Sequence, residues 1–182
     1  MDRRWRRVLA IGVVAAATVT GSVMVANGDD GGGRNSNIRE TLSGFEEDLL
    51  ALSTTGTGEF RAQIADTGDE IAYTLSYSAL EGDVLQAHIH LGGRAQSGGI
   101  SVFLCTNLGN GPVGTQLCPA APATIEGVLT ADDVIGPAAQ GITAGQFDEL
   151  VNAIRDGSTY VNVHSSLYQG GEIRAQLGEH VM

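Results

Sequence analysis

Apolar and polar residues alternate along much of the chain after residue 37, and turn-forming residues separate the alternating runs. A period of two is typical of β-strands with one face in the core, because successive side chains of a strand point to opposite faces. The pattern predicts eight strands, at residues 38–44, 59–65, 71–77, 84–91, 100–105, 123–129, 159–164 and 172–177. The turn at 66–69 predicts a hairpin between the second and third of these strands, and residues 81–83 form the next turn.

One segment near the C-terminus has the period of a helix instead. Thr143 and Gln146 fit a capping box, so we expect a helix to begin there. Gly157 is suited to end it. The apolar residues between them are spaced i, i+3, i+4 and i+7, namely Phe147, Leu150, Val151 and Ile154. This spacing predicts one amphipathic helix that covers an end of an all-β domain, next to the C-terminal hairpin.

Two of the predicted strands, 84–91 and 159–164, hold three of the four histidines of the chain. If Ile89 and Val163 face the core, the alternate positions lie on the opposite face of the sheet. Those positions are His88, His90 and His164. Side chains at i and i+2 of a strand are about 7 Å apart, which lets two imidazoles converge on one ion while a neighbouring strand supplies a third. The sequence therefore predicts a candidate copper or zinc site.

The last predicted hairpin adds a carboxylate to this hypothesis. Its polar face would pair Tyr160 with Gln176, Asn162 with Arg174, and His164 with Glu172. Glu172 could then accept a hydrogen bond from an imidazole N–H and orient that ring from outside the ligand set. Two alternatives remain open: a surface ion pair between Glu172 and Arg174, and histidines that only hydrogen-bond to loops.

Cys105 and Cys118 are the only cysteines, and they flank a segment rich in Gly, Asn and Pro. In an exported chain an even pair of this kind predicts a disulfide. The spacing does not match the C-x-x-C pattern of thiolate metal or redox sites, so we reject that alternative.

The N-terminus has the features of an export signal. Four arginines lie among residues 3–7, and residues 8–26 are uncharged and mostly apolar. We expect a signal peptide over residues 1–26, with an uncleaved membrane anchor as the alternative. Residues 27–37 have the composition of a flexible linker, the domain follows at 38–178, and 179–182 form a tail. The expected location is therefore secreted or extracytoplasmic, in the cell envelope.

Charge restricts the partners of the chain. The formal net charge is −11, and all ten basic residues are arginines. An acidic surface repels phosphate backbones, so we expect no nucleic-acid partner, and contact with a membrane only through an uncleaved N-terminal segment.

Six short motifs occur along the domain: LSGFEE at 42–47, AHIH at 87–90, FLCTN at 103–107, AAQGI at 138–142, YVNVH at 160–164 and GGEIRAQL at 170–177. Together they resemble the CHRD domain, a family named from repeats in chordin, an extracellular antagonist of bone morphogenetic proteins. The resemblance implies an antiparallel β-sandwich or barrel of the immunoglobulin-like or superoxide-dismutase-like kind. A likeness to Cu,Zn superoxide dismutase rests on the His-x-His and Val-His motifs. The remaining histidine, His180, follows the last strand, so we do not expect a two-metal site.

Two functions follow from these sequence features. The first is a secreted or cell-surface CHRD protein with a non-enzymatic role, binding an unidentified extracellular protein or envelope component. The alternative is a mononuclear copper or zinc protein that uses His88, His90 and His164, with possible redox activity. Hydrolysis by Ser165 or Ser166 beside His164 is disfavoured, because neither a nucleophile elbow nor an ordered acid accompanies them. We assign no catalytic residue.

Overall fold

The computed structural model describes residues 36–178, which form eight antiparallel strands, one α-helix and three short 3₁₀ turns. The predicted signal peptide, nearly all of the predicted linker and the tail with His180 lie outside the described residues. The strands are β1 (Asn37–Ser43), β2 (Thr57–Ile64), β3 (Ile71–Ser78), β4 (Val84–Leu91), β5 (Ile100–Thr106), β6 (Ala123–Leu129), β7 (Thr159–Ser165) and β8 (Ile173–Leu177). All eight predicted strands are present, each within two residues of its expected start and end.

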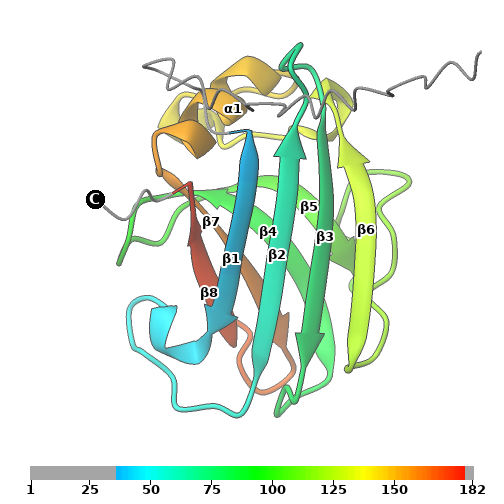
Figure 1. The fold of residues 1–182 in the computed structure, drawn as a ribbon. Helices are drawn as coiled ribbons and strands as arrows, with labels where there is room; N and C mark the ends of the chain where they lie inside the picture. Colours follow the sequence, from blue (N-terminus) through cyan, green and yellow to red (C-terminus); the bar gives the residue numbers. More distant parts are fainter. Residues whose placement is uncertain (1–35, 179–182) are drawn as a thin grey trace, which may run out of the picture. The chain divides into compact units, whose positions relative to one another are not determined.

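The strands form one sheet in the order β5-β4-β7-β8-β1-β2-β3-β6. The sheet curls into a nearly closed barrel, with β1, β2, β3 and β6 side by side in front and β4, β5 and β7 behind them (Figure 1). Contacts between the two ends of this strand order narrow the gap: the Tyr73 hydroxyl of β3, the strand next to the edge strand β6, donates to the Leu104 carbonyl of the other edge strand, β5, at 3.2 Å. The expected all-β barrel or sandwich is confirmed.

The core lies between these two layers and contains the apolar half of each alternating strand. In β3 the buried positions are Ile71, Tyr73, Leu75 and Tyr77. In contrast, every residue of β7 and β8 is buried. One face of these two strands packs on the core, so loops must cover the other, which is the face that carries the candidate site.

The register of the last hairpin agrees with its prediction over the residues where β7 and β8 are paired. Tyr160 lies opposite Gln176, Asn162 opposite Arg174, and Val163 opposite Ile173. The ladder ends there, and the Glu172 N–H donates to the Val163 carbonyl at 2.8 Å.

The helix α1 (Phe147–Arg155) lies at one end of the barrel (Figure 1). Its buried residues are the predicted Phe147, Leu150, Val151 and Ile154. The predicted start was wrong, because the helix begins at Phe147 rather than after Thr143. Gln146 does accept from the Thr143 N–H at 2.6 Å, but Gly145 between them has φ +83° and leaves the helical conformation. Gly157, at φ +74°, follows the helix end as predicted.

Short 3₁₀ turns complete the fold: η1 (Gly44–Glu46) follows β1, whereas η2 (Ala131–Asp133) and η3 (Ala138–Gln140) lie between β6 and α1. Among residues 36–178, no helix combines the length and the apolar character needed to cross a membrane.

Candidate metal centre

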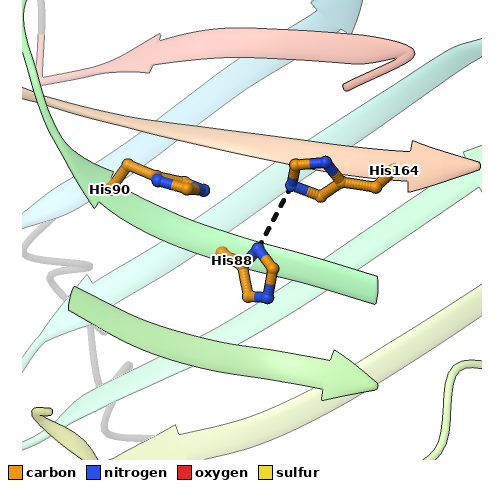
Figure 2. A group of neighbouring side chains, drawn as sticks. All are labelled: His88, His90 and His164. Carbon is orange, nitrogen blue, oxygen red and sulfur yellow. Dashed lines mark hydrogen bonds between the residues drawn. The ribbon is translucent and has the colours of Figure 1, made fainter. Parts of the chain in front are cut away.

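The three predicted histidines come together on the loop-covered face of β4 and β7. These strands are antiparallel neighbours in which His90 lies opposite Tyr160 and His164 lies opposite Gln86, which places His164 diagonally across from His88. One nitrogen from each ring lies within 4.8 Å of the corresponding nitrogens of the other two. Figure 2 shows the His164 ring directed from β7 toward the two rings of β4. The predicted cluster is confirmed: strand parity gave the shared face, and the family resemblance implied that the two strands are neighbours.

Two of the nitrogens already have the separation of ligands that share an ion. Nδ1 of His88 and Nε2 of His164 are 3.1 Å apart (Figure 2). Two nitrogens bound tetrahedrally to zinc, each about 2.0–2.1 Å from the metal, lie roughly 3.3 Å apart. In the metal-free protein, the same distance lets one ring donate a hydrogen bond to the other.

Backbone carbonyls fix the proton positions of the other two rings. His90 Nδ1–H donates to the Gly98 carbonyl, and His164 Nδ1–H donates to the Gln169 carbonyl, both at 2.9 Å. Because a carbonyl can only accept, each ring carries its proton on Nδ1 and presents the lone pair of Nε2. Hydrogen bonds of this kind orient histidine ligands in metal sites.

Burial keeps the imidazoles neutral. The exposed fractions of His88, His90 and His164 are 0%, 7% and 6%. Burial lowers the pKa of His88 to about 2, with a further lowering from the neighbouring His164 and His90. Burial also lowers the pKa of His90 to about 4, and it lowers the pKa of His164. Neutral imidazole is the form that binds metals, so at neutral pH only the proton on Nδ1 of His88 has to move, to the other nitrogen of the same ring.

Several buried polar atoms in the cluster have no hydrogen-bond partner. They include Nε2 of His88, Nε2 of His90 and Oδ1 of Asn162. A buried polar group without a partner costs roughly 1–3 kcal/mol, so each of these atoms calls for an explanation. Nε2 of His90 and Oδ1 of Asn162 are unpaired acceptors of the kind that bind a cation.

Aromatic and cationic side chains stack beside the cluster. Tyr160 lies parallel to His90, with ring centroids 4.8 Å apart, and Phe103 meets His88 edge to face at 4.4 Å. The Arg174 guanidinium lies 3.5 Å from the centre of the Tyr160 ring. Arg174 also donates to the Gly93 and Gln96 carbonyls, at 3.0 and 3.1 Å. It thereby holds the glycine-rich loop whose Gly98 carbonyl orients His90.

The predicted role of Glu172 beside an imidazole was wrong. Glu172 is fully buried, but its carboxylate accepts from the Thr54 hydroxyl at 2.8 Å and from the Glu81 N–H at 2.7 Å. The regular pairing of β7 with β8 ends at Val163 and Ile173, so the cross-strand position assumed for Glu172 does not exist. The surface-pair alternative is not found either, since Arg174 bonds to loop carbonyls and lies 4.0 Å from Asp48.

The partners that do orient the rings could not have been chosen by residue type. Gly98 and Gln169 act through backbone carbonyls, which every residue possesses. For these partners, the glycine-rich loop directly after His90 was the one available indication. The sequence did offer a signal for Asn162, another residue of this face, because it precedes His164 by two residues on the same strand.

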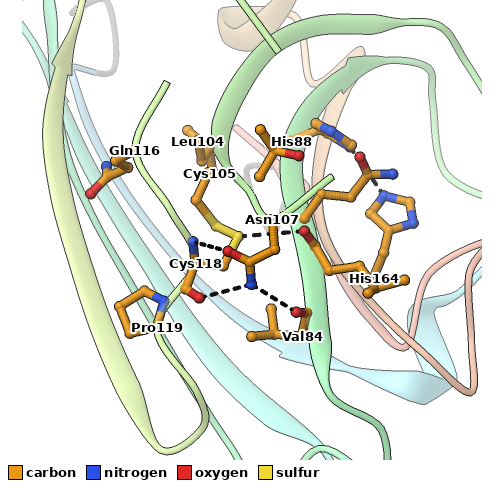
Figure 3. Close-up of a disulfide and its surroundings, with 12 residues drawn as sticks. Val84, His88, Leu104, Cys105, Asn107, Gln116, Cys118, Pro119 and His164 are labelled. Carbon is orange, nitrogen blue, oxygen red and sulfur yellow. Dashed lines mark hydrogen bonds between the residues drawn. A yellow bond between two sulfur atoms is a disulfide. The ribbon is translucent and has the colours of Figure 1, made fainter. Parts of the chain in front are cut away.

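The predicted disulfide is present near the start of β4. Cys105 and Cys118 are joined, with an S–S distance of 2.01 Å. Figure 3 shows Asn107 beside it, donating to the carbonyls of Val84 at 3.0 Å and Cys118 at 2.9 Å. The bridge and this amide fasten the 107–118 loop to the edge of the sheet.

Comparison with known proteins gives one match. A family model described as CHRD domain matches residues 38–177, which are nearly all of the described residues. No curated protein and no solved structure matches the chain.

Proposed function

The chain belongs to the CHRD domain family, and from this premise we propose that it is an extracytoplasmic, non-enzymatic protein that holds one copper or zinc ion. His88, His90 and His164 would supply the ligands. The observation that carries the proposal is the convergence of three neutral, buried imidazoles whose donor nitrogens lie within 4.8 Å of one another.

The donor set suits copper and zinc better than the other common metals. Imidazole nitrogens favour copper, zinc, iron and nickel, whereas magnesium and calcium prefer oxygen ligands. Three histidines form a recognised zinc ligand set that leaves a fourth position. With nitrogen ligands, copper(II) binds more tightly than zinc in simple affinity. A bound ion would lie among rings that are at most 7% exposed.

Two features support a location outside the cytoplasm. The disulfide between Cys105 and Cys118 is typical of an oxidising compartment. The N-terminal sequence, with arginines followed by a long apolar run, has the pattern of an export signal.

Elemental analysis tests the proposal directly. The protein is purified without a His-tag, and its copper and zinc contents are measured beside those of the His90→Ala variant. We expect about one ion per chain in the original protein and a large loss in the variant. Equal and negligible metal contents in both proteins, after incubation with copper and with zinc, would reject the metal site.

A second role, contact with an extracellular protein or envelope component, is favoured by a short segment after β1. Phe45, Leu49 and Leu50 lie close together in the sequence and are 71%, 85% and 78% exposed. Apolar side chains gathered on a surface often mark a binding site. Replacing all three by serine should abolish capture of any envelope component by the immobilised protein while leaving its melting temperature unchanged. Equal capture by both proteins would reject this role for the segment.

A further inference from the structure

Asn162 lies among the three histidines. It belongs to β7, lies directly opposite His88 of β4, and precedes His164 by two residues. Alternate residues of one strand share a face, and so do directly paired residues of neighbouring strands. The Asn162 carboxamide therefore emerges on the face of the sheet that carries the cluster.

The carboxamide oxygen is buried and has no hydrogen-bond partner. Asn162 is 2% exposed, and its Oδ1 makes no hydrogen bond. The carboxamide is close enough to the His90 ring to raise the pKa of that ring slightly, against the larger effect of burial. Oδ1 of Asn162 and Nε2 of His90 nevertheless form no hydrogen bond with each other, so both keep a lone pair.

Arg174, the neighbouring side chain that could donate a hydrogen bond to Oδ1 of Asn162, donates to loop carbonyls instead. Arg174 lies opposite Asn162 on β8 and carries five N–H groups. Its guanidinium donates to the Gly93 and Gln96 carbonyls and stacks on Tyr160. The buried carbonyl oxygen of Asn162 thus remains unpaired, as does Nε2 of His90.

We propose that the Oδ1 atom of Asn162 is the fourth ligand of the ion held by His88, His90 and His164. This inference rests on the proposed function. Three histidines leave one position open on a tetrahedral zinc ion, and an amide oxygen can fill it or act as a weak axial ligand of copper(II). The position that would otherwise take water is thereby occupied by the protein.

The fourth ligand also distinguishes between metals. An amide oxygen is a hard donor, which suits zinc(II) and copper(II), whereas copper(I) favours softer ligands. Asn162 should therefore contribute to the binding of divalent ions and contribute little to the binding of copper(I). Its side chain would set which ion the site retains.

The test uses two substitutions with opposite expectations. Asn162→Leu has nearly the same size but no donor atom, and Asn162→Asp keeps an oxygen and adds a negative charge. Asn152→Leu, at an exposed position of α1, serves as the matched control. Affinities for zinc(II) and copper(I) are measured by competition with chelators, and copper(II) is examined by electron spin resonance.

We expect Asn162→Leu to weaken zinc(II) binding by about tenfold or more and to change the copper(II) spectrum, with copper(I) affinity nearly unchanged. Asn162→Asp should bind zinc(II) at least as tightly as the original protein. Without metal, Asn162→Leu should melt at the same or a higher temperature, because it removes a buried acceptor that has no partner. Folding of each variant is checked in this way.

Two results would contradict the inference in different ways. If the original protein binds zinc(II) and Asn162→Leu binds it equally well with an identical copper(II) spectrum, Asn162 is not a ligand, although the three-histidine site stands. If the original protein binds none of these ions, the proposed function and the inference fail together.

Discussion

Nδ1 of His88 lies 3.1 Å from Nε2 of His164, although the two residues are 76 positions apart in the chain. The pairing of β4 with β7 creates this contact, and carbonyls from two separate loops orient His90 and His164 around it. Because His164 carries its proton on Nδ1, His88 Nδ1–H donates to His164 Nε2 in the metal-free protein, and an ion bound by both nitrogens would take the place of that proton.

The histidines should make the metal-free protein sensitive to mild acid. Their folded-state pKa values are lowered, to about 2 for His88 and about 4 for His90, from the ordinary 6.5. Below about pH 6.5 the unfolded chain therefore binds protons that the folded protein does not, and the free energy of unfolding falls as the pH approaches 4. Urea unfolding at pH 7, 6 and 5 measures this. The His90→Gln variant should show a shallower decline, and an equal decline would contradict the assignment.

Glu47 should act in the opposite direction. Burial raises its pKa to about 8, and Arg174 offsets only part of this effect. The folded protein thus keeps a proton that the unfolded chain has lost, and this contribution to stability disappears as the pH rises from about 4.5 through 8. Glu47→Gln should exceed the original protein in unfolding free energy at pH 9 by more than about 1 kcal/mol. An unchanged value at pH 9 would mean that the carboxyl group is solvated.

Leu150 is the fully buried centre of α1. Leu150→Ala should lower the free energy of unfolding by about 2–5 kcal/mol, because it removes apolar contacts and leaves a cavity. Denaturant titration measures the loss, with Glu149→Ala on the exposed side of the helix as the control. A loss below about 1 kcal/mol would show that the helix does not pack as described.

The disulfide should stabilise the fold by closing a loop between cysteines that are 13 positions apart. In the chain-entropy model, closing a loop of this size contributes roughly 3 kcal/mol. Replacing both Cys105 and Cys118 by alanine should lower the unfolding free energy by about this amount, and a reducing agent should destabilise only the original protein. Equal stability with and without the reducing agent would contradict the bridge.

Strand positions could be predicted because they depend on local alternation. Parity on two strands placed His88, His90 and His164 on one face, and the family resemblance implied that the two strands are neighbours. The error at Glu172 arose where the ladder ends, since the side-chain direction there depends on the turn that follows. The late start of α1 depends on the conformation of one residue, Gly145.

Other parts of the site could not be predicted from residue types. The carbonyls of Gly98 and Gln169 orient the rings of His90 and His164, but every residue has a backbone carbonyl, so the residue type does not indicate this role. Burial of the histidine face depends on loops that Arg174 and Asp48 fasten from distant parts of the chain. These long-range contacts change the pKa values of the rings, which local patterns cannot show.

Titration of the protein with copper(II), followed by electron spin resonance, tests the central claim most directly. We predict one tight site per chain, with hyperfine structure from nitrogen ligands, and with binding lost in His90→Ala and His164→Ala. Since copper(II) binds imidazole nitrogen more tightly than zinc does, zinc should displace the bound copper(II) only at a large excess. Weak binding that is identical in the original protein and in both variants would contradict the three-histidine site.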